Sequence, residues 1–291
     1  MERTVETQKK RSMALEIWRR LRKNKMAMLG LVILVMLALT AIFADVIADY
    51  DTKVIAQDIK NRLQGPSMEH WCGTDEFGRD IFARLVHGSR VSLVVGLISV
   101  SISLLMGGAF GAIAGYYGGR VDNVIMRIMD IFLAVPSILL AMTIVAALGT
   151  SLINVMLAIG VSGIPGYARI VRASVMSIKD QEFVEASRAI GAKSPTTIFR
   201  EILPNCLAPI IVQATLSVAG AILSTASLSF IGLGVQPPSP EWGAMLSGGR
   251  NYLRDALHLT LFPGLAIVIT ILALNLLGDG LRDALDPRLK Q

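Results

Sequence analysis

Five long stretches without a charged residue constrain what this chain of 291 residues can fold into. About 20 consecutive apolar residues cross the hydrocarbon core of a bilayer as an α-helix, and each stretch is long enough to do so. Only 17% of the residues are charged, whereas soluble domains carry about 25%. A soluble fold is therefore disfavoured, and the 53% hydrophobic content excludes a disordered chain. The charge-free stretches are residues 26–44, 91–119, 131–168, 202–240 and 256–278.

Two of these stretches are too long for one helix. Residues 149–154, with the sequence Gly-Thr-Ser-Leu-Ile-Asn, favour a turn and divide 131–168 into two helices. The end of 202–240 is rich in glycine and proline and is interpreted as a loop after one helix. The sequence thus predicts an all-α membrane protein with six transmembrane helices and with both termini on one side. The predicted spans are 26–44, about 91–115, 128–148, 152–169, 206–230 and 257–278.

Lysine and arginine predict the orientation, because they gather on the cytoplasmic side of membrane proteins. Of the 28 such residues, 20 fall in the segments on the side of the N-terminus and 8 in those on the other side. Both termini are therefore predicted to be cytoplasmic. The net charge of +6 is mainly a consequence of topology, so no nucleic-acid partner is predicted.

The chain is predicted to comprise three regions. Near the start of the N-terminal region, residues 12–25 form either a basic amphipathic helix on the cytoplasmic membrane surface or an ordinary solvated tail. The regions are residues 1–88, with the first span at 26–44 and an outer segment at 45–88; residues 89–279, the transmembrane domain with a cytoplasmic loop at 170–205; and residues 280–291, a cytoplasmic tail.

The outer segment is predicted to contain a helix along the outer membrane surface. Thr74 or Asp75 can cap it, and it is expected to run to about His87 with apolar residues on one side. Two pairs of opposite charge stand at i,i+4 spacing, which favours a helix. These pairs are Asp75–Arg79 and Asp80–Arg84.

No ionisable residue lies in the middle of a predicted span. Ion-coupled carriers generally need one, although backbone carbonyls also bind sodium. Membrane-embedded metal and redox enzymes generally need histidine or cysteine ligands within the spans. His70 and Cys72 form only an H-x-C pair in the outer segment, so no metal site is predicted. An embedded enzyme is disfavoured, and a self-sufficient secondary carrier or channel stands as the alternative function.

Nucleotide binding and disulfide formation are not predicted either. The chain contains no Walker A pattern. Residues 246–250, Leu-Ser-Gly-Gly-Arg, resemble the signature motif of transporter ATPases, but they fall in a predicted outer loop and are interpreted as a Gly-rich turn. Cys72 is predicted outside the membrane and Cys206 near the cytoplasmic end of the fifth span, so the two cannot pair.

Glycines recur every four residues along the second span, at Gly107, Gly111, Gly115 and Gly119. They share one helix face and allow a neighbouring helix to approach closely. This face is interpreted either as a functional interface within or between subunits or as ordinary packing. Residues expected to bend or loosen the third and fourth spans are Pro136, Gly163, Pro165 and Gly166.

The cytoplasmic loop at 170–205 is predicted to form a helix, a turn and a second short helix. The first helix begins at a capping-box-like Ser177-x-x-Asp180, and Gly191 fits the C′ position, where positive φ is needed. Such a hairpin presents a short amphipathic helix that suits a groove of a partner, or it is a packed loop.

The second helix of this loop is predicted to start at Ser194-Pro195, which suits an N-cap followed by the first helical position. Pro204 is expected to end it. Its apolar face comprises Ile198, Phe199, Ile202 and Leu203.

The sequence of this loop resembles a known family. EASRAIG at 185–191, followed by ILP at 202–204, is similar to the EAA loop of ABC importer permeases. The departures are Ser187 in place of an alanine and Glu201 in the isoleucine slot. The residues that match in register are Glu185, Ala186, Gly191, Leu203 and Pro204.

Three further stretches, 73–93, 232–250 and 262–290, resemble the permeases of the dipeptide, oligopeptide and nickel group. The similarity covers nearly the whole chain from about residue 12, and it is greatest to the C-type permease, which has one extra N-terminal span. The resemblance implies a type I ABC importer transmembrane domain with a cytoplasmic coupling helix.

The resemblance further implies a permease subunit, and not an enzyme, in the cytoplasmic (inner) membrane of a bacterium or archaeon. The implied partners are a second homologous permease in a heterodimer, two ATPase subunits and an extracytoplasmic substrate-binding protein. ATP and Mg²⁺ would be held by the ATPases, and this chain would hold no cofactor. The implied function is to move a peptide or a similar small solute from the external binding protein into the cytoplasm. Dipeptides and oligopeptides are the commonest cargo of the family, and glutathione, nickel chelates and sugars stay open.

Functional residues are assigned to three groups. The outer loop is expected to dock the binding protein through Pro237, Pro238 and Trp242. The residues that the resemblance assigns to ATPase coupling are Glu185, Ala186, Gly191, Ala192, Lys193, Ser194, Pro195, Phe199, Leu203 and Pro204.

The third group consists of uncharged polar residues within the spans, which line the cargo path or, more commonly, form hydrogen bonds between helices. The candidates are Asn154, Gln213, Ser217, Ser224 and Asn275, with Thr215 and Thr225 in the same class.

Overall fold

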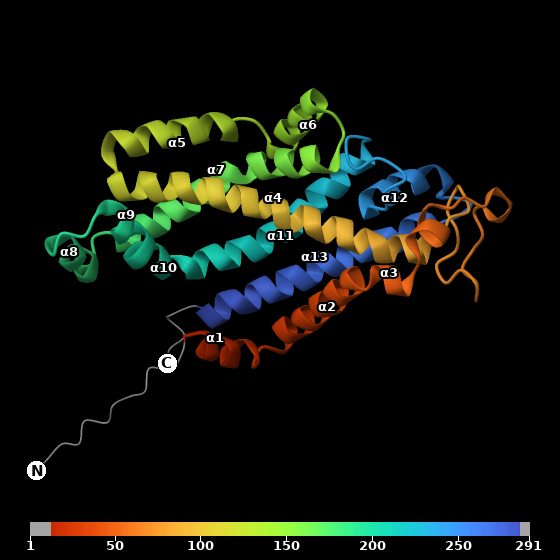
Figure 1. The fold of residues 1–291 in the computed structure, drawn as a ribbon, viewed down its shortest axis with the longest axis horizontal. Coiled ribbons are helices and arrows are strands. Elements are labelled where there is room, and N and C mark those ends of the chain that lie inside the picture. The colour runs from red at the N-terminus through yellow and green to blue at the C-terminus, as the bar shows by residue number, and fades with distance from the viewer. Residues whose placement is uncertain (1–12, 286–291) are drawn as a thin grey trace, which may run out of the picture.

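The long helices of the protein run side by side in an elongated bundle (Figure 1). A computed structural model describes residues 13–285, and the regular elements in that range are all helical. One end of the bundle carries α8, and the opposite end carries α12 and the outer segment (Figure 1). The α-helices are α1 (Met13–Leu21), α2 (Lys25–Ile42), α3 (Ala44–Ile47), α4 (Ile81–Tyr117), α5 (Gly119–Leu133), α6 (Ser137–Leu148), α7 (Leu152–Ile178), α8 (Glu182–Ala189), α9 (Ser194–Thr196), α10 (Leu203–Asn205), α11 (Leu207–Phe230), α12 (Trp242–Gly249) and α13 (His258–Leu285). Short π-helices span Tyr50–Ile55 and Thr197–Ile202, and 3₁₀ turns span Ile59–Asn61 and Arg250–Tyr252.

Within the described residues, α2, α4, α7, α11 and α13 are each long and apolar enough to cross a membrane. The pair α5–α6 passes the same test together, although its two helices meet at 82°. The packing of its neighbours shows that this pair crosses the bundle. Gly107 of α4 faces Ile164 of α7, and Gly115 faces Arg172, so α4 and α7 run parallel. The chain must return to the outer end between them, which gives six spans and confirms the predicted number.

Close packing of α4 on α7 depends on three of the four recurring glycines. A Cβ added to Gly107 or Gly111 would lie 2.4 Å from a backbone oxygen of α7, and one added to Gly115 would lie 2.9 Å from another. No side chain fits at such distances, so the glycine face forms an interface within the chain. A Cβ added to Gly119 would have no atom within 4 Å, so this glycine does not take part in the close packing. It instead begins α5, with φ +53°.

The third span is divided into two helices at Pro136, where the sequence predicts only a bend or a loosening of one helix over about 128–148. α5 ends at Leu133, and α6 begins at Ser137 after Pro136. Proline lacks an N–H and disfavours the helical conformation of the residue before it, here Val135, so the helix stops. Pro165, by contrast, lies inside α7, which continues past it to Ile178, well beyond the predicted end of that span at residue 169.

The prediction of a helix along the outer membrane surface, from Thr74 or Asp75 to about His87, is wrong. Gly73 and Gly78 have φ of +80° and +77°, which a helix cannot accommodate, and the chain forms a turn there. α4 begins only at Ile81, and its N-cap is Asp80, whose Oδ1 accepts a hydrogen bond from the Ala83 N–H at 2.8 Å. This helix continues without a break into the second span, so it does not lie along the membrane surface.

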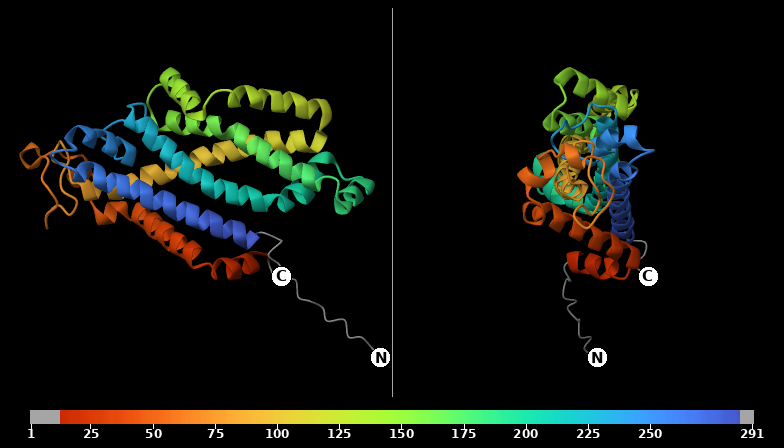
Figure 2. Two further views of the ribbon diagram at one scale, coloured as in Figure 1. Left: turned by 180° about the vertical axis from the view of Figure 1, so that it is seen from behind. Right: turned by 90° about the vertical axis from the view of Figure 1, so that its right-hand side faces the viewer.

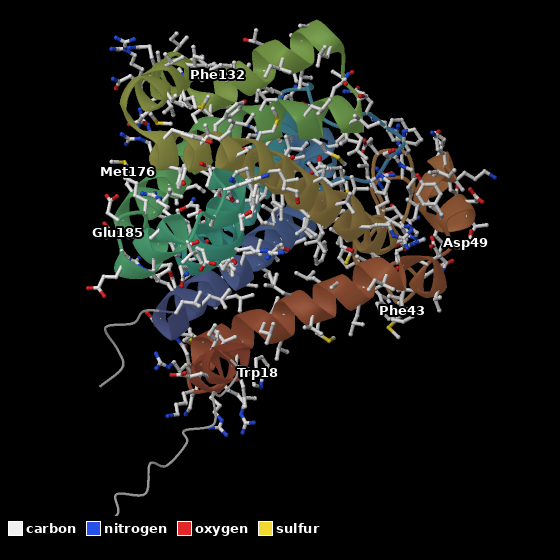
Figure 3. All side chains as sticks on the ribbon, turned by 60° about the vertical axis from the view of Figure 1, so that its left-hand side comes forward. Trp18, Phe43, Asp49, Phe132, Met176 and Glu185 are labelled. Atoms are coloured by element: carbon white, nitrogen blue, oxygen red, sulfur yellow. The ribbon has the colours of Figure 1, made fainter. Side chains whose placement is uncertain are left out.

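Edge elements complete the bundle. α1 and α2 lie on one edge and α5 and α6 on the opposite edge in every view (Figures 1 and 2). α1 packs against the end of α13 through Leu21 and Ala284. Glu185 lies at the opposite end of the molecule from Phe43 and Asp49 (Figure 3), which agrees with the predicted separation of a cytoplasmic loop from an outer segment.

Candidate functional site

The loop after α7 forms the predicted helical hairpin, with corrections to its boundaries. The first helix, α8, follows Gln181, and no side chain caps it. The Ser177 hydroxyl instead donates to the Ser174 carbonyl at 2.8 Å within the end of α7, so the predicted capping box is wrong. Gly191 has φ +86°, as the C′ position requires. Lys193, one residue before the predicted Ser194, is the N-cap of α9.

A buried cluster anchors the hairpin to the bundle. Val184 of α8 is fully buried, and it packs in one cluster with Ile198, Ile202 and the residues Val171 and Val175 of α7. The guanidinium of Arg188 also lies 5.0 Å from the ring centroid of Tyr116, at the end of α4. The hairpin is therefore packed against α7 and α4.

Other apolar side chains of the hairpin face outward. Ile190 is 86% exposed and Phe199 is 70% exposed. Phe199 does not share the buried face of Ile198 and Ile202, and Thr197–Ile202 is a π-helix in place of the predicted α-helical turn. Pro204 does not end the helical path either, since α10 includes it.

The predicted coupling residues are mostly accessible. Glu185 is exposed and forms no ion pair within residues 13–285, so it does not brace the hairpin through another charge. Exposed residues of the predicted set are Glu185, Ala186, Gly191, Lys193, Pro195, Phe199 and Pro204, and partly buried ones are Ala192, Ser194 and Leu203.

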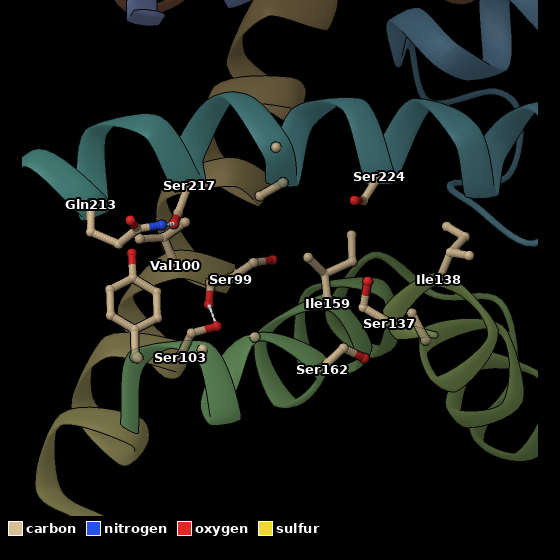
Figure 4. A pocket seen from close by; sticks show the side chains of 16 residues that line it. Ser99, Val100, Ser103, Ser137, Ile138, Ile159, Ser162, Gln213, Ser217 and Ser224 are labelled. Atoms are coloured by element: carbon tan, nitrogen blue, oxygen red, sulfur yellow. Dashed lines mark hydrogen bonds between the residues drawn. The ribbon is translucent and has the colours of Figure 1, made fainter. Parts of the chain in front are cut away.

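A second site is a cavity of about 290 Å³ near the middle of the bundle (Figure 4). Its wall comes from the central turns of α4, α7 and α11 and from the first turns of α6. The polar groups in this wall are hydroxyls and one amide, and none is ionisable at neutral pH. They belong to Ser99, Ser103, Ser137, Ser162, Tyr167, Gln213, Ser217 and Ser224.

Hydrogen bonds fix several of these groups. The Ser103 hydroxyl donates to the carbonyl of Gly160 at 2.6 Å, which ties α4 to α7. Gln213 Nε2 donates to the Ser217 hydroxyl at 3.1 Å (Figure 4). The Tyr167 hydroxyl is buried and has no hydrogen-bond partner within residues 13–285. A buried polar atom left without a partner is costly, so it is available to a ligand or to water.

Three of the five predicted path residues, Gln213, Ser217 and Ser224, line this cavity. Asn154 does not, because its amide donates to the Leu148 and Gly149 carbonyls and closes the turn before α7. Asn275 is an exposed residue of α13 outside the cavity. Thr215 and Thr225 donate to carbonyls of their own helix.

Sequence reasoning missed five of the cavity residues. The i,i+4 spacing of Ser99 and Ser103 places both hydroxyls on one face of α4 and was the available signal. Ser137 was missed because Pro136 was expected only to bend or loosen the third span, and not to divide it into two helices. The missed residues are Ser99, Ser103, Ser137, Ser162 and Tyr167.

The outer loop departs from its predicted role at Trp242. This side chain is 1% exposed, and its indole N–H donates to the Leu85 carbonyl at 3.1 Å, so it anchors α12 and cannot contact a docked protein. Pro237 and Pro238 are exposed. Residues 246–249, interpreted as a Gly-rich turn, instead form the second half of α12.

Buried charges hold the outer segment together. Arg79 Nε donates to Asp75 Oδ2 at 2.6 Å, as the spacing predicts, although in a turn. The predicted pair Asp80–Arg84 does not form, because each residue has another partner. Asp80 Oδ2 lies 2.8 Å from His70 Nδ1, within hydrogen-bond distance, and Arg84 Nη1 donates to the Val54 carbonyl at 3.0 Å.

Neither of the two cysteines forms a disulfide, as predicted. Burial raises the pKa of the Cys72 thiol in the outer segment, so this thiol stays protonated at neutral pH.

Two family models match this chain. One, described as "Binding-protein-dependent transport system inner membrane component", matches residues 107–291. The other, described as "N-terminal TM domain of oligopeptide transport permease C", matches residues 12–66. The chain belongs to the binding-protein-dependent transport system inner membrane components.

Curated relatives of this permease are similar over nearly their whole length. The dipeptide transport system permease protein DppC of Alkalihalophilus pseudofirmus is 51% identical over 275 residues, which cover 94% of this chain and 90% of the relative. The di/tripeptide transport system permease protein DppC of Pseudomonas aeruginosa is 48% identical over 279 residues, with 94% and 92% covered. The glutathione transport system permease protein GsiD of Escherichia coli O157:H7 is 46% identical over 275 residues, with 94% and 90% covered.

The permease also matches a solved transporter. A chain of the methionine ABC transporter MetNI in an inward-facing conformation aligns with a TM-score of 0.57 at 20% identity, covering 70% of this permease and 96% of that chain. This likeness concerns the fold, which is that of a type I ABC importer transmembrane subunit. The predicted family and the predicted fold class are confirmed, and the protein is a multi-pass permease subunit of an ABC importer.

Proposed function

We propose that this permease forms one half of a cargo pathway and pairs with a second, homologous permease. Two ATPase subunits would bind below it and hold ATP and Mg²⁺, and an extracytoplasmic binding protein would deliver cargo from outside. The assembly would lie in the cytoplasmic membrane of a bacterium or archaeon. The observation that carries the proposal is the hairpin after α7, which is anchored by Val184 and presents Ile190 and Phe199 outward.

The hairpin fits the groove of an ATPase subunit. Ile190 and Phe199 are large apolar side chains, and an exposed pair of this kind at a cytoplasmic end suits a helix-in-groove contact. Glu185 and Lys193 are exposed nearby in the sequence and supply polar contacts at the rim.

The same hairpin connects mechanically to the cavity. Val184 packs on Val171 and Val175 of α7, and the preceding turns of α7 carry Ser162 and Tyr167 into the cavity wall. A displacement of the hairpin by the ATPases would therefore move α7 and change the shape of the cavity. Rigid-body movement of this kind would alternate the cavity between the two sides of the membrane.

The cargo we propose is a short peptide or a similar small solute. Hydroxyl and amide groups such as those of Ser217 and Gln213 are suited to hydrogen bonds with peptide amides. Among the described residues, no side chain of the cavity wall is charged at neutral pH, so the wall does not favour one charge of cargo over the other. The similarity to permeases named for dipeptides and glutathione supports this cargo class.

The proposal is tested by replacing Phe199 with aspartate in the complete complex. A charged side chain there would not enter an apolar groove, so cargo uptake and binding-protein-stimulated ATPase activity should both fall at least tenfold. Phe43→Asp is the matched control, because Phe43 is 51% exposed at the outer end of α2, far from the hairpin. Normal uptake and stimulation in Phe199→Asp would refute the coupling role.

The alternative, a self-sufficient carrier or channel, makes an opposite prediction. Proteoliposomes that hold this chain alone should then take up cargo without ATP. We expect no uptake from the chain alone and ATP-dependent uptake once the second permease, the ATPases and the binding protein are present.

A further inference from the structure

The outer end of the bundle, where α12 and the outer segment lie (Figure 1), contains a second cavity of about 260 Å³. Its wall comes from the turn before α4, the first turn of α4, the end of α11 with the loop that follows, α12 and the start of α13. Among the described residues, none lines both this outer cavity and the central one. The two cavities are therefore separate sites.

The two cavities also adjoin different sides of α11. Gln213, Ser217 and Ser224 of the central cavity are spaced by four and seven residues, so they share one face of the helix. Ser229 lines the outer cavity and follows Ser224 by five residues, which turns it by about 140° around the helix axis. A ligand in the outer cavity would thus lie beside the proposed cargo path and not in it.

Positive charge exceeds negative charge in the wall of the outer cavity. The wall contains two carboxylates, those of Asp75 and Glu76, and three guanidinium groups, those of Arg79, Arg84 and Arg250. Arg79 and Arg84 are only 5% and 4% exposed, so water screens them poorly. A buried charge without a partner is costly, and this wall lacks one negative charge.

The carboxylate of Asp75 is the main partner of the two buried arginines, and they share it. Its Oδ2 accepts a hydrogen bond from Arg79 Nε at 2.6 Å and lies 3.5 Å from Arg84 Nε. Its Oδ1 accepts from the backbone N–H groups of Phe77 and Arg79. Glu76 Oε1 is 3.9 Å from Arg79 Nη2, beyond hydrogen-bond distance. One carboxylate therefore serves two guanidinium groups and two amides.

A further buried carboxylate at this end, that of Glu241, is already used. It accepts hydrogen bonds from the N–H groups of Gly243 and Ala244 at 2.9 and 2.8 Å, and so caps α12. Glu241 does not line the outer cavity. Its charge is compensated by the start of the helix and not by the arginines.

Several donors of the wall have no partner within residues 13–285. Arg84 Nη1 donates to the carbonyls of Val54 and Pro238, at 3.0 and 3.3 Å, but Arg84 Nη2 and both Nη atoms of Arg79 form no hydrogen bond there. The Ser229 hydroxyl is also buried without a partner. Native structures rarely leave such groups unpaired, so the wall is built for a ligand that accepts hydrogen bonds. Water accepts them too, but it does not supply the missing negative charge.

An oxyanion has the chemistry that this wall requires. Guanidinium groups bind phosphate and carboxylate oxygens through parallel N–H donors, and such charge-assisted hydrogen bonds are stronger than neutral ones. A metal cation is disfavoured, because like charges repel. Arg250 and Asn251 are exposed at the rim of the cavity, which gives an anion a way in from the outer side.

We propose that the outer cavity binds a small oxyanion such as phosphate, held by Arg79, Arg84 and Arg250. The bound anion joins the turn at residues 75–84 to α12 and to the loop after α11, and it stabilises the outer end of the subunit. The site goes beyond the proposed function, since it lies outside the cargo path and does not depend on which cargo is carried.

Two sources present this group to the site. The guanidinium of Arg250 lies 5.8 Å from the ring centroid of Phe230, the last residue of α11. The end of this span places Arg250 near the outer membrane surface, where the phosphates of lipid headgroups lie and soluble anions also have access. A soluble anion and a lipid headgroup therefore offer the same chemistry.

Inorganic phosphate is the probe for this site. We expect saturable binding to the complete complex in a neutral, lipid-free detergent, measured by isothermal titration calorimetry with the nucleotide sites filled by a non-hydrolysable ATP analogue. Arg250→Gln should weaken this binding about tenfold, because it removes one guanidinium group of the wall. Arg254→Gln is the matched control. Arg254 is an exposed arginine nearby that does not line the cavity, so its loss should change the affinity by less than about twofold.

The buried part of the wall gives a second measurement. Arg79→Gln should abolish phosphate binding, but it also breaks a buried ion pair that holds the outer segment. Asn251→Asp leaves that pair in place and adds a negative charge of nearly the same shape at the rim, so it should weaken binding about tenfold. Asn123→Asp, at an exposed position near the start of α5, adds the same charge at the opposite end and should have no effect.

The site would be overturned by the absence of saturable binding to the unaltered complex. Equal affinities of Arg250→Gln and Arg254→Gln, or of Asn251→Asp and Asn123→Asp, would overturn it as well. Reconstitution in lipid nanodiscs then identifies the source. Phosphate binding that is lost in discs containing phosphatidylglycerol would assign the site to a lipid headgroup, and binding that is retained there would assign it to a soluble anion.

Discussion

Gly191 provides a sharp test of how the hairpin is built. Its φ is +86°, a region that costs a residue with a Cβ about 1–2 kcal/mol. A Cβ added there would have no atom within 4 Å, so the whole penalty comes from the backbone and none from a clash. Gly191→Ala should therefore reduce the population of the native turn about 5–30-fold, since 1.4 kcal/mol corresponds to a factor of ten.

The series of substitutions at this position has a predicted order. Asparagine tolerates positive φ best among residues with a side chain, and a β-branched residue tolerates it least. Uptake and binding-protein-stimulated ATPase activity of the complete complex should fall in the order Gly, Asn, Ala, Val. Basal ATPase activity of the complex should change less, because the substitution does not touch the nucleotide-binding subunits.

A matched control separates backbone strain from the loss of glycine as such. Gly65 is exposed in the outer segment, has no atom within 4 Å of an added Cβ and does not have positive φ. Gly65→Val should leave uptake and stimulation near the original values. Equal activity of Gly191→Val and Gly65→Val would refute the argument that this turn positions the hairpin for coupling.

Three further predictions concern packing and thiol chemistry. Gly111→Val would place a Cβ 2.4 Å from the Ala168 carbonyl oxygen and should lower the thermal stability of the purified complex by about 1–3 kcal/mol or more, whereas Gly108→Val, whose Cβ meets only a side-chain carbon at 4.0 Å, should not. Trp242→Ala should cost about 3–5 kcal/mol of stability in the same assay, because it empties a buried site; a loss of binding-protein affinity without a loss of stability would contradict this. Burial raises the pKa of the Cys72 thiol in the outer segment, so its maleimide labelling in solubilised protein should rise about tenfold per pH unit from pH 7 to 8; a pH-independent rate would contradict the raised pKa.

Much of the architecture could be predicted because membrane insertion imposes a strong pattern. The charge-free runs located α2, α4, α7, α11 and α13, and the end of α11 at Phe230 was predicted to the residue. The glycine spacing on α4 predicted its close packing, since only glycine allows two backbones to approach so closely. The turn at Gly191 could be predicted because a helix end needs positive φ there.

The errors share a physical cause, which is competition from contacts distant in sequence. Asp80 and Arg84 have the spacing of a helical pair, but a carbonyl 30 residues away binds Arg84 instead. Trp242 stands in a proline-rich outer loop, where an exposed aromatic is plausible, yet the Leu85 carbonyl 157 residues away draws its indole into the core. Local sequence does not contain these partners.

The most informative error concerns the charges within the spans. Asp130 stands near the end of the predicted third span, where a charge suggests nothing more than a boundary. Breaking that span at Pro136 places Asp130 close to the middle of the α5–α6 crossing, and its partner Arg169 is 39 residues away. The pair is compensated, so it does not supply the lone titratable group that ion coupling generally needs. Without such a group, the movement of this subunit has to be driven from outside it, at the hairpin.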